Sequence, residues 1–378
     1  MKLNQSVSRN PLTDQIWSQR IAVKPQPIRL TKERLLEEAE ELELDPETRG
    51  IKLLYEKYPY PTPATGDSLI RDLTNVIEVL FPKQDFENWQ ILDAGCGSGH
   101  RLLALAKNYP KAKFTGIDLS ASSLSVASQI ARKNGITNVT FEQANLLDLH
   151  LSNEYRLIVS TGVVHHLHDP QLGLKNIYNY LSADGLLYTW FYHSFGEFHR
   201  LLDRELARLL WGTEQSDFQE GISILEELDL KLPAEQYGTK TSAPAEVDIS
   251  QLSINADAYL HPIVNAYRFH EAIEMFRQAD ADWAAINGIN LKGKSRLIDL
   301  DRVSDLPFLC LSDVELFQSR RLTEKYHGLD NLNKLRAIEL SLRPTGFSIV
   351  AGRNASFSQC GSRIEHNAVR FLPDSPAR

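Results

Sequence analysis

The residues best placed to do chemistry form a short stretch in which an acid is followed by three alternating glycines. Residues 91–99 read ILDAGCGSG. The apolar start predicts a buried strand, and the glycines predict a tight turn where the backbone comes close to a ligand. Residues 100–106 read HRLLALA and predict a helix that begins at the turn. Strand, glycine turn and helix in this order are typical of a nucleotide site.

Asp93 indicates which kind of nucleotide this turn suits. The glycine spacing is GxGxG rather than GxGxxG, and Asp93 stands two residues before the first glycine, Gly95. A carboxylate at that position repels a pyrophosphate and attracts a cation. The stretch therefore favours a cationic nucleoside without phosphate and argues against a nicotinamide dinucleotide.

With its acid and its glycines, the stretch resembles the first motif of the class I S-adenosylmethionine-dependent methyltransferases. S-adenosylmethionine carries a sulfonium and an ammonium group and no phosphate. The resemblance extends over residues 90–191, which contain five predicted strands in the expected order. This region is similar to the cores of bacterial type 11 and type 12 methyltransferases. The segment YEKYPYPTP at residues 55–63 resembles a segment that precedes some of these cores. Its three tyrosines suggest a rigid aromatic flap over the ligand, and a packed turn is the alternative.

The ends of the following strands supply the rest of the expected cofactor site. Asp118 ends a strand predicted over 113–117, where a carboxylate can accept two hydrogen bonds from the ribose hydroxyls. A helix cap is the alternative role, although Ser120 could take it. The resemblance implies that Leu119 lies against adenine and that Asn145 meets its amino group, where an aspartate is commoner. The expected cofactor-binding residues are Asp93, Gly95, Cys96, Gly97, Gly99, Asp118, Leu119, Asn145, Leu146 and Thr161.

Three histidines follow the fourth predicted strand, in the loop TGVVHHLHDP at residues 161–170. Ligands of parallel sheets lie beyond the carboxyl ends of the strands, so this loop belongs to the expected site. We expect His166 to act as a general base because imidazole titrates near neutrality, and we rank His165 and His168 lower. The loop resembles the VLHHL.DP segment of the family, in which the position of His166 recurs with many substrates, so a structural role is the alternative. No metal site is expected, since no carboxylate or cysteine completes a ligand set.

The order of the predicted elements indicates the fold that positions these residues. We expect an α/β, Rossmann-like sheet of seven mostly parallel strands, with helices on both faces and helical insertions that cover the site. The last strand, over 347–351, is expected to be antiparallel, and one helical stretch is expected over 312–341. The expected regions are an N-terminal arm with the aromatic flap (1–66), a cofactor-binding core (67–191), a helical cover for the acceptor (192–266), the completion of the core (267–353) and a mobile tail (354–378).

Composition limits the partners and the compartment. The net charge of −8 argues against nucleic acid or an anionic membrane as the main partner. The three cysteines, Cys96, Cys310 and Cys360, are far apart, which fits a reducing cytoplasm and gives no zinc spacing. No apolar run approaches the roughly 18 residues of a membrane span, and residues 1–30 lack the apolar core of a signal peptide. The sequence does not indicate an oligomeric state.

The expected function is transfer of a methyl group from S-adenosylmethionine to an unidentified acceptor by in-line displacement. A small molecule is favoured over a protein as the acceptor. His261, Asn265 and Tyr267 are candidates for binding it, with a satisfied turn and core as the equal alternative. The alternative function is a non-catalytic S-adenosylmethionine-binding or scaffold protein of the same fold.

Overall fold

The computed structural model describes residues 44–60, 77, 80–81, 86–212, 217–232, 249–291, 294–302 and 307–371. The chain divides into two compact units, Met1–Leu44 and Asp45–Arg378, and the second contains all the helices and strands among these residues. Residues 1–43 of the expected arm lie outside the described residues. So do the helix that apolar spacing predicts over 67–81, apart from three of its residues, and residues 233–248 of the exposed loop that the Pro, Ser and Thr content predicts over 233–250. Among the described helices, none combines the length and hydropathy that a bilayer crossing requires.

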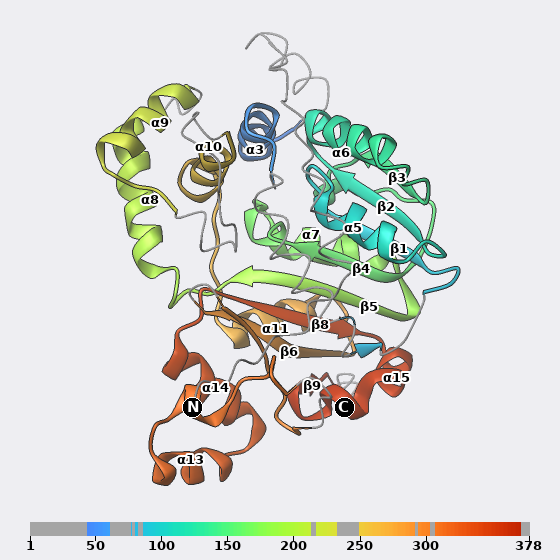
Figure 1. The fold of residues 1–378 in the computed structure, drawn as a ribbon, viewed down its shortest axis with the longest axis vertical. Helices are drawn as coiled ribbons and strands as arrows, with labels where there is room; N and C mark the ends of the chain where they lie inside the picture. The colour runs from blue at the N-terminus through green and yellow to red at the C-terminus, as the bar shows by residue number, and fades with distance from the viewer. Residues whose placement is uncertain are drawn as a thin grey trace, which may run out of the picture. The chain divides into compact units, whose positions relative to one another are not determined.

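One sheet forms the centre of the second unit (Figure 1). Its strands are β1 (Gln90–Ala94), β2 (Lys113–Asp118), β3 (Val139–Gln143), β4 (Tyr155–Thr161), β5 (Leu181–Tyr192), β6 (Trp283–Leu291), β7 (Lys294–Leu297), β8 (Gly346–Gly352) and β9 (Ala368–Arg370). They lie in the order β3-β2-β1-β4-β5-β8-β6-β7, with β9 also paired to β6. Strands β1 to β5 are parallel, and β8 pairs antiparallel with both β5 and β6. The predicted Rossmann-like fold and the antiparallel last strand of the core are confirmed, and the described sheet has nine strands rather than seven because β7 and β9 extend it.

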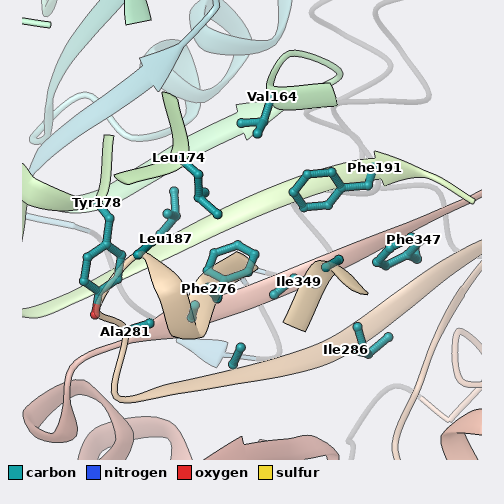
Figure 2. Packing of buried hydrophobic residues seen from close by; sticks show 14 of the residues in the cluster. Val164, Leu174, Tyr178, Leu187, Phe191, Phe276, Ala281, Ile286, Phe347 and Ile349 are labelled. Carbon is teal, nitrogen blue, oxygen red and sulfur yellow. The ribbon is translucent and has the colours of Figure 1, made fainter. Parts of the chain in front are cut away.

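Helices cover both faces of this sheet. They are α5 (His100–Asn108), α6 (Ala121–Lys133), α7 (Pro170–Asn179), α11 (Phe269–Gln278) and α15 (Asn354–Ile364). Alternate residues of a strand point to opposite faces, so β5 contributes Leu187 and Phe191 to one core cluster and Leu186 and Tyr188 to the other. Figure 2 shows the first cluster, in which side chains of α7 and α11 pack against β5 and β8.

A separate group of helices, here called the helical cover, packs around its own apolar cluster. It comprises α3 (Pro46–Lys57), α8 (Phe198–Trp211), α9 (Phe218–Glu227), α10 (Ile249–Asn255) and the π-helix η4 (Ala256–Leu260). Figure 1 shows α3, α8, α9 and α10 grouped at one side of the sheet. The pair Asp45-Pro46 in the sequence predicts a helix start, with an N-cap followed by proline at the first helical position. Helix α3 confirms it: Asp45 accepts a hydrogen bond from the Thr48 amide at 2.8 Å, and Pro46 occupies the first helical position.

One prediction for the C-terminal part is refined and another is wrong. The helical stretch predicted over 312–341 is helical and consists of three helices, α12 (Asp313–Leu316), α13 (Arg320–His327) and α14 (Asn331–Leu342). Separate N-caps begin α12 and α14. Ser312 forms a capping box at α12, and Asp330 accepts a hydrogen bond from the Asn333 amide at 2.9 Å at the start of α14. The tail predicted to be mobile forms α15, a 3-10 turn and β9 as far as Arg370.

A few well-placed aromatic contacts explain why the tail is ordered despite its polar composition. The ring of Phe357 lies 5.4 Å from that of Trp283 on β6, and the Arg370 guanidinium lies 4.6 Å from the centre of the Phe357 ring. The indole nitrogen of Trp283 donates to the carbonyl of Arg353 at 3.0 Å. These contacts hold β9 beside β6 without the continuous apolar pattern that sequence reasoning looks for.

A buried carboxylate joins α14 to the chain that leaves β5. Glu339 is 2% exposed and accepts hydrogen bonds from the Phe269 amide at 2.9 Å and from Nε2 of His193 at 3.0 Å. It also forms an ion pair with Arg268. Burial alone raises the pKa of Glu339, but the bonds from His193, Arg268 and the Phe269 amide outweigh it and lower the pKa to about 2.

Replacing Glu339 with glutamine should therefore lower the free energy of unfolding by about 3 kcal/mol at pH 7, because the neutral amide loses the charge-assisted contacts that lower the folded pKa of the carboxylate from 4.5 to about 2. The folded pKa lies below the usual value of 4.5, so this stabilisation is complete above pH 4.5 and is lost as the pH falls toward 2. Urea unfolding at pH 7 and pH 3.5 measures the difference, which should shrink at the lower pH. Glu324→Gln, in an exposed pair with Arg320, is the matched control; an equal effect of the two substitutions would contradict the assignment.

Candidate functional site

The glycine turn after β1 adopts a backbone that other residues rarely adopt. Gly95, Gly97 and Gly99 have φ angles of 81°, 53° and 76°. A methyl group on Gly95 would lie 2.4 Å from Cγ2 of Val163, and one on Gly99 would lie 2.7 Å from Cβ of Ala127. The turn therefore needs glycine for its dihedral angles and, at Gly95 and Gly99, for the close approach of neighbouring side chains, while the predicted approach of a ligand stays a prediction.

The carboxylate of Asp118 lies directly against this turn. One oxygen accepts a hydrogen bond from the Gly97 amide at 2.7 Å, and the other accepts from the Ser120 amide at 2.9 Å. Burial raises the pKa of Asp118 to about 6, although the two amide bonds act in the opposite direction. The cap of α6 is Ser120, whose hydroxyl accepts from the Ser123 amide at 3.1 Å. The alternative role of Asp118 as a helix cap is thus already filled by its neighbour.

Asp93 forms a buried ion pair inside the chain. It is 2% exposed, and its oxygens lie 3.1 Å and 3.4 Å from nitrogens of the Arg101 guanidinium, which is 3% exposed. Burial raises the pKa of Asp93, and the charge of Arg101 opposes that rise. The charge that was expected to attract a cationic ligand is therefore compensated by Arg101, and the place of Asp93 in the cofactor site stays a prediction. Burial also raises the pKa of the neighbouring Cys96 thiol, which keeps it uncharged.

The remaining predicted cofactor residues lie at the ends of β2, β3 and β4, which reach the same edge of the sheet as the glycine turn. Asn145 accepts from the Leu147 amide at 3.0 Å and so caps a short 3-10 turn, η1 (Leu146–Asp148). Leu146 is buried and Leu119 is half-buried. Thr161 ends β4, and its buried hydroxyl has no hydrogen-bond partner among the described residues.

Helix α3 and the residues after it lie against this edge. The Ser98 amide of the glycine turn donates to the carbonyl of Tyr60 at 3.2 Å, and the Ser122 amide at the start of α6 lies 3.3 Å from the Glu56 carboxylate. The ring of Tyr58 meets that of Phe218 on α9 edge-on at 6.1 Å. The described part of the tyrosine segment thus contacts both the turn and the helical cover, while residues 61–63 lie outside the described residues and the flap stays a prediction.

A cluster of three histidines lies where β4 and β5 end. His165 and His166 belong to the short turn η2 (Val164–His166), and His261 follows η4. The centres of the His166 and His261 rings are 3.9 Å apart, and those of His165 and His166 are 4.3 Å apart. The side chain of Tyr192 closes the cluster at 4.4 Å from the ring of His165. No residue of this cluster is more than one-tenth exposed.

Burial lowers the pKa of each histidine in this cluster. The pKa of His166 falls to about 3, and the positive charges of Arg200 and Arg204 contribute to the decrease. Burial also lowers the pKa of His165 and of His261 well below the usual value. All three rings are therefore neutral at pH 7, and His166 is a weaker base than an ordinary histidine. Within the part of the chain that the structure describes, no three His, Cys, Asp or Glu side chains, these histidines included, are arranged so that they could hold a metal ion.

The third histidine of the loop, His168, lies apart from the cluster. Its Nδ1 is 3.1 Å from a carboxylate oxygen of Asp45 and 3.3 Å from the hydroxyl of Thr48. His168 therefore joins the start of α3 to the loop after β4. This contact explains how a helix far away in the sequence is held over the edge of the sheet.

Three arginines that sequence reasoning missed position His261. Arg200, Arg204 and Arg208 are spaced four residues apart on α8 and share one face of it. Their guanidinium groups donate to carbonyl oxygens at the end of η4, among them those of Ala258 and His261. The carbonyls at the end of a helix lack partners within it and carry partial negative charge, so cations there are favourable. The repeat RxxxRxxxR was the available signal.

Asn265 and Tyr267, the other two candidates for acceptor binding, hold the histidine loop in place. The amide side chain of Asn265 donates to the carbonyl of His165 at 3.2 Å, and its backbone amide donates to the same carbonyl at 2.9 Å. Tyr267 pairs through its backbone amide with the carbonyl of Tyr192 at 2.9 Å and packs its ring against Phe191. These contacts support the turn-and-core alternative for both residues.

Comparison with known proteins agrees with this geometry. Residues 85–206 match the family model described as a methyltransferase domain. An uncharacterized protein of Synechococcus is 27% identical over 336 residues, which cover 82% of this chain and 73% of that one. A malonyl-[acyl-carrier protein] O-methyltransferase of Bacillus cereus is 35% identical over 117 residues, and the match covers 30% of this chain and 42% of the relative.

A solved structure shares the fold over a longer range. PKMT2 from Rickettsia typhi, which has also been solved in complex with AdoHcy, has 18% sequence identity and a TM-score of 0.52. The match covers 79% of this chain and 55% of the Rickettsia protein, so the chain spans about half the length of that relative. The glycine turn, the acid at the end of β2 and the family match lead to one conclusion. Residues 85–206 match a methyltransferase domain and lie in a Rossmann-like sheet, in agreement with the predicted resemblance to the class I S-adenosylmethionine-dependent methyltransferases.

Proposed function

We propose that this protein binds S-adenosylmethionine at the glycine turn and transfers its methyl group to a small-molecule acceptor under the helical cover. The observation that carries the proposal is the position of Asp118, whose oxygen lies 2.7 Å from the Gly97 amide. A carboxylate offers about four lone-pair sites, and backbone amides use two of them here. The other two suit the paired hydroxyls of a ribose.

The other cofactor contacts follow from the same placement. Gly95, Cys96, Gly97 and Gly99 bring backbone close to the ligand, as their dihedral angles and neighbours require. Leu119 and Leu146 supply apolar contact for the adenine ring. Asn145 uses one lone pair of its carbonyl oxygen to cap η1 and keeps the second for the adenine amino group. The unpartnered hydroxyl of Thr161 completes the set on the side of β4.

The chemistry needs little activation by the protein. The methyl group of S-adenosylmethionine already sits on a sulfonium, so orientation and exclusion of water account for most of the catalysis. We assign His166 as the side chain that accepts a hydrogen bond from the acceptor, since its neutral ring can orient a nucleophile even though its low pKa makes it a poor proton carrier. Residues 192–266 form the cover of the acceptor site in this proposal.

Two observations support a small-molecule acceptor. The histidine cluster is buried beneath the helical cover rather than open on the surface. The net charge of −8 disfavours a nucleic acid. The Bacillus relatives named as O-methyltransferases match 30% of this chain, so they support the co-substrate and leave the acceptor open.

Calorimetric titration of the purified protein with S-adenosylmethionine and S-adenosylhomocysteine tests the proposal. Only the ionised carboxylate of Asp118 accepts hydrogen bonds with both oxygens, and its pKa is about 6. The affinity should therefore be constant above pH 7 and fall about tenfold between pH 7 and pH 5 as the group becomes protonated. Absence of binding to the folded protein would refute the proposal and favour the scaffold alternative.

A further inference from the structure

One backbone residue fixes the protonation pattern of two stacked histidines. The carbonyl of Ile263 lies 2.8 Å from Nδ1 of His166, and the amide of the same residue lies 3.1 Å from Nδ1 of His261. The two rings are 3.9 Å apart and inclined by 35°. Ile263 thus contacts Nδ1 of both rings, with its carbonyl as an acceptor at His166 and its amide as a donor at His261.

The two contacts require opposite tautomers. A carbonyl only accepts, so Nδ1 of His166 carries the proton and its Nε2 has a free lone pair. A backbone amide only donates, so Nδ1 of His261 is unprotonated and its neutral ring carries the proton on Nε2. Nε2 of His261 is buried without a hydrogen-bond partner among the described residues, which leaves a donor to be satisfied by a ligand.

Both Nδ1 atoms contact the backbone of Ile263 and the ring centres are 3.9 Å apart, so we infer that the two Nε2 atoms lie within reach of one small polar group. Together they offer one acceptor and one donor. A hydroxyl or a carboxamide can satisfy both, because each of these groups donates one hydrogen bond and accepts another. An ammonium group can only donate, and a carboxylate can only accept.

The charges around the pair disfavour a cationic ligand. Arg204 lies beside His261, and burial together with the neighbouring arginines lowers its pKa to about 9, which leaves it charged at pH 7. The acids nearby already have partners: Glu197 pairs with Arg200, and Asp257 accepts from the Tyr55 hydroxyl at 2.7 Å. An incoming ammonium group would meet a net positive field without a free carboxylate to receive it.

From these contacts we propose that the His166–His261 pair selects a neutral hydroxyl or carboxamide group on the methyl acceptor. This inference rests on the proposed methyltransferase function, which it refines by naming the acceptor chemistry. Nε2 of His166 accepts a hydrogen bond from that group, and Nε2 of His261 donates a hydrogen bond to its oxygen. The three arginines of α8 act as positioning residues, since they hold the end of η4 and with it His261.

The tautomers can be tested on the wild-type protein without any ligand. In protein labelled with ¹⁵N-histidine, long-range ¹H–¹⁵N correlation spectra distinguish a protonated from an unprotonated ring nitrogen. The expected result is a protonated Nδ1 for His166 and a protonated Nε2 for His261, assigned from spectra of single-site variants. The same tautomer in both rings, or a doubly protonated ring at pH 7, would overturn the inference.

The ligand preference is tested with four probes that share one ring: benzyl alcohol, benzamide, benzylamine and benzoate. The alcohol and the amide should shift the Nε2 resonances of both histidines, and the charged probes should not. His261→Phe should weaken binding of benzyl alcohol by up to about tenfold, while His261→Gln, which keeps an N–H group near that position, should retain the preference. The matched control is His150→Phe, because the His150 side chain is exposed and remote from the pair in sequence.

Calorimetry with S-adenosylmethionine on the same sample separates the two proposals. Binding of S-adenosylmethionine with the wrong tautomers, or with a preference for benzylamine or benzoate, overturns the selection by the histidine pair and leaves the methyltransferase proposal in place. If the tautomers and the probe preference are as expected but S-adenosylmethionine does not bind, the methyltransferase proposal is overturned. The assignment of the histidine pair to a methyl acceptor is then overturned as well.

Discussion

Replacing Arg101 with methionine should lower the free energy of unfolding by about 3–5 kcal/mol at pH 8, because it leaves the buried carboxylate of Asp93 without its partner. Methionine keeps most of the apolar stem of the side chain, so the loss reports the charge rather than a cavity. Urea unfolding followed by circular dichroism provides the measurement.

The pH dependence of this variant identifies the cause. Burial already raises the pKa of Asp93, and loss of Arg101 removes the charge that opposes the rise. A carboxyl group whose folded pKa is raised favours folding as the pH drops through that value, so the defect of Arg101→Met should shrink from pH 8 to pH 5. The double variant with Asp93→Asn should recover most of the stability, because a buried neutral amide costs far less than an unpaired charge.

A surface pair provides the control for the general effect of losing an arginine. Arg320 is 93% exposed at its side chain and pairs with Glu324 on the same helix. Arg320→Met should change the free energy of unfolding by about 0.5 kcal/mol or less. If Arg101→Met were equally mild, the buried pair would not be the contact that fastens β1 to α5.

Replacing Asp118 with asparagine should reduce the affinity for S-adenosylmethionine by roughly 100-fold. Hydrogen bonds to a charged acceptor contribute about 1.5–3 kcal/mol each, and the substitution removes the charge from two proposed bonds to the ribose. Asparagine keeps a carbonyl oxygen that can accept from the Gly97 amide, so the turn stays folded. Isothermal titration of both proteins with S-adenosylmethionine and S-adenosylhomocysteine measures the effect.

Asp148→Asn is the matched control for this substitution. Asp148 is an exposed acid on the segment after β3, so its loss changes the net charge equally without touching the turn. Its affinity should equal that of the wild type. The affinity of Asp118→Asn should also be independent of pH between pH 7 and pH 5, because asparagine does not titrate. If this variant bound S-adenosylmethionine as tightly as the wild type, the ribose role of Asp118 would be excluded.

The parallel core was predictable because each of its elements carries a local signal. Strands β1 and β4 contain short buried apolar runs, and alternate β5 residues pack on opposite faces of the sheet. Gly95 and Asp118 were singled out by residue type and by position at a strand end, and their roles in binding a cofactor stay predictions. The same local logic predicted the cap at Asp45, where the carboxylate and the following proline lie next to each other in sequence.

The acceptor side was less predictable because its contacts join residues far apart in the chain. The partner of His166 is the backbone of Ile263, and a backbone contact leaves no mark on residue types. Glu339 and His193, which form a hydrogen bond, are likewise far apart in the sequence. Arg101 could have been proposed as the partner of Asp93, since a strand, a turn and one helical turn bring them together, but composition alone does not show that both are buried.

The position of β8 affects how the protein is made. On a ribosome β5 is complete long before residues 346–352 appear, yet those residues fill the space between β5 and β6. At about 5–20 residues per second, the nascent chain carries the open edge of β5 for on the order of 10–30 s. Exposed strand edges promote aggregation. Translation speed and chaperone capacity should therefore influence the yield of this protein more than that of a fold whose strands pair in the order of their synthesis.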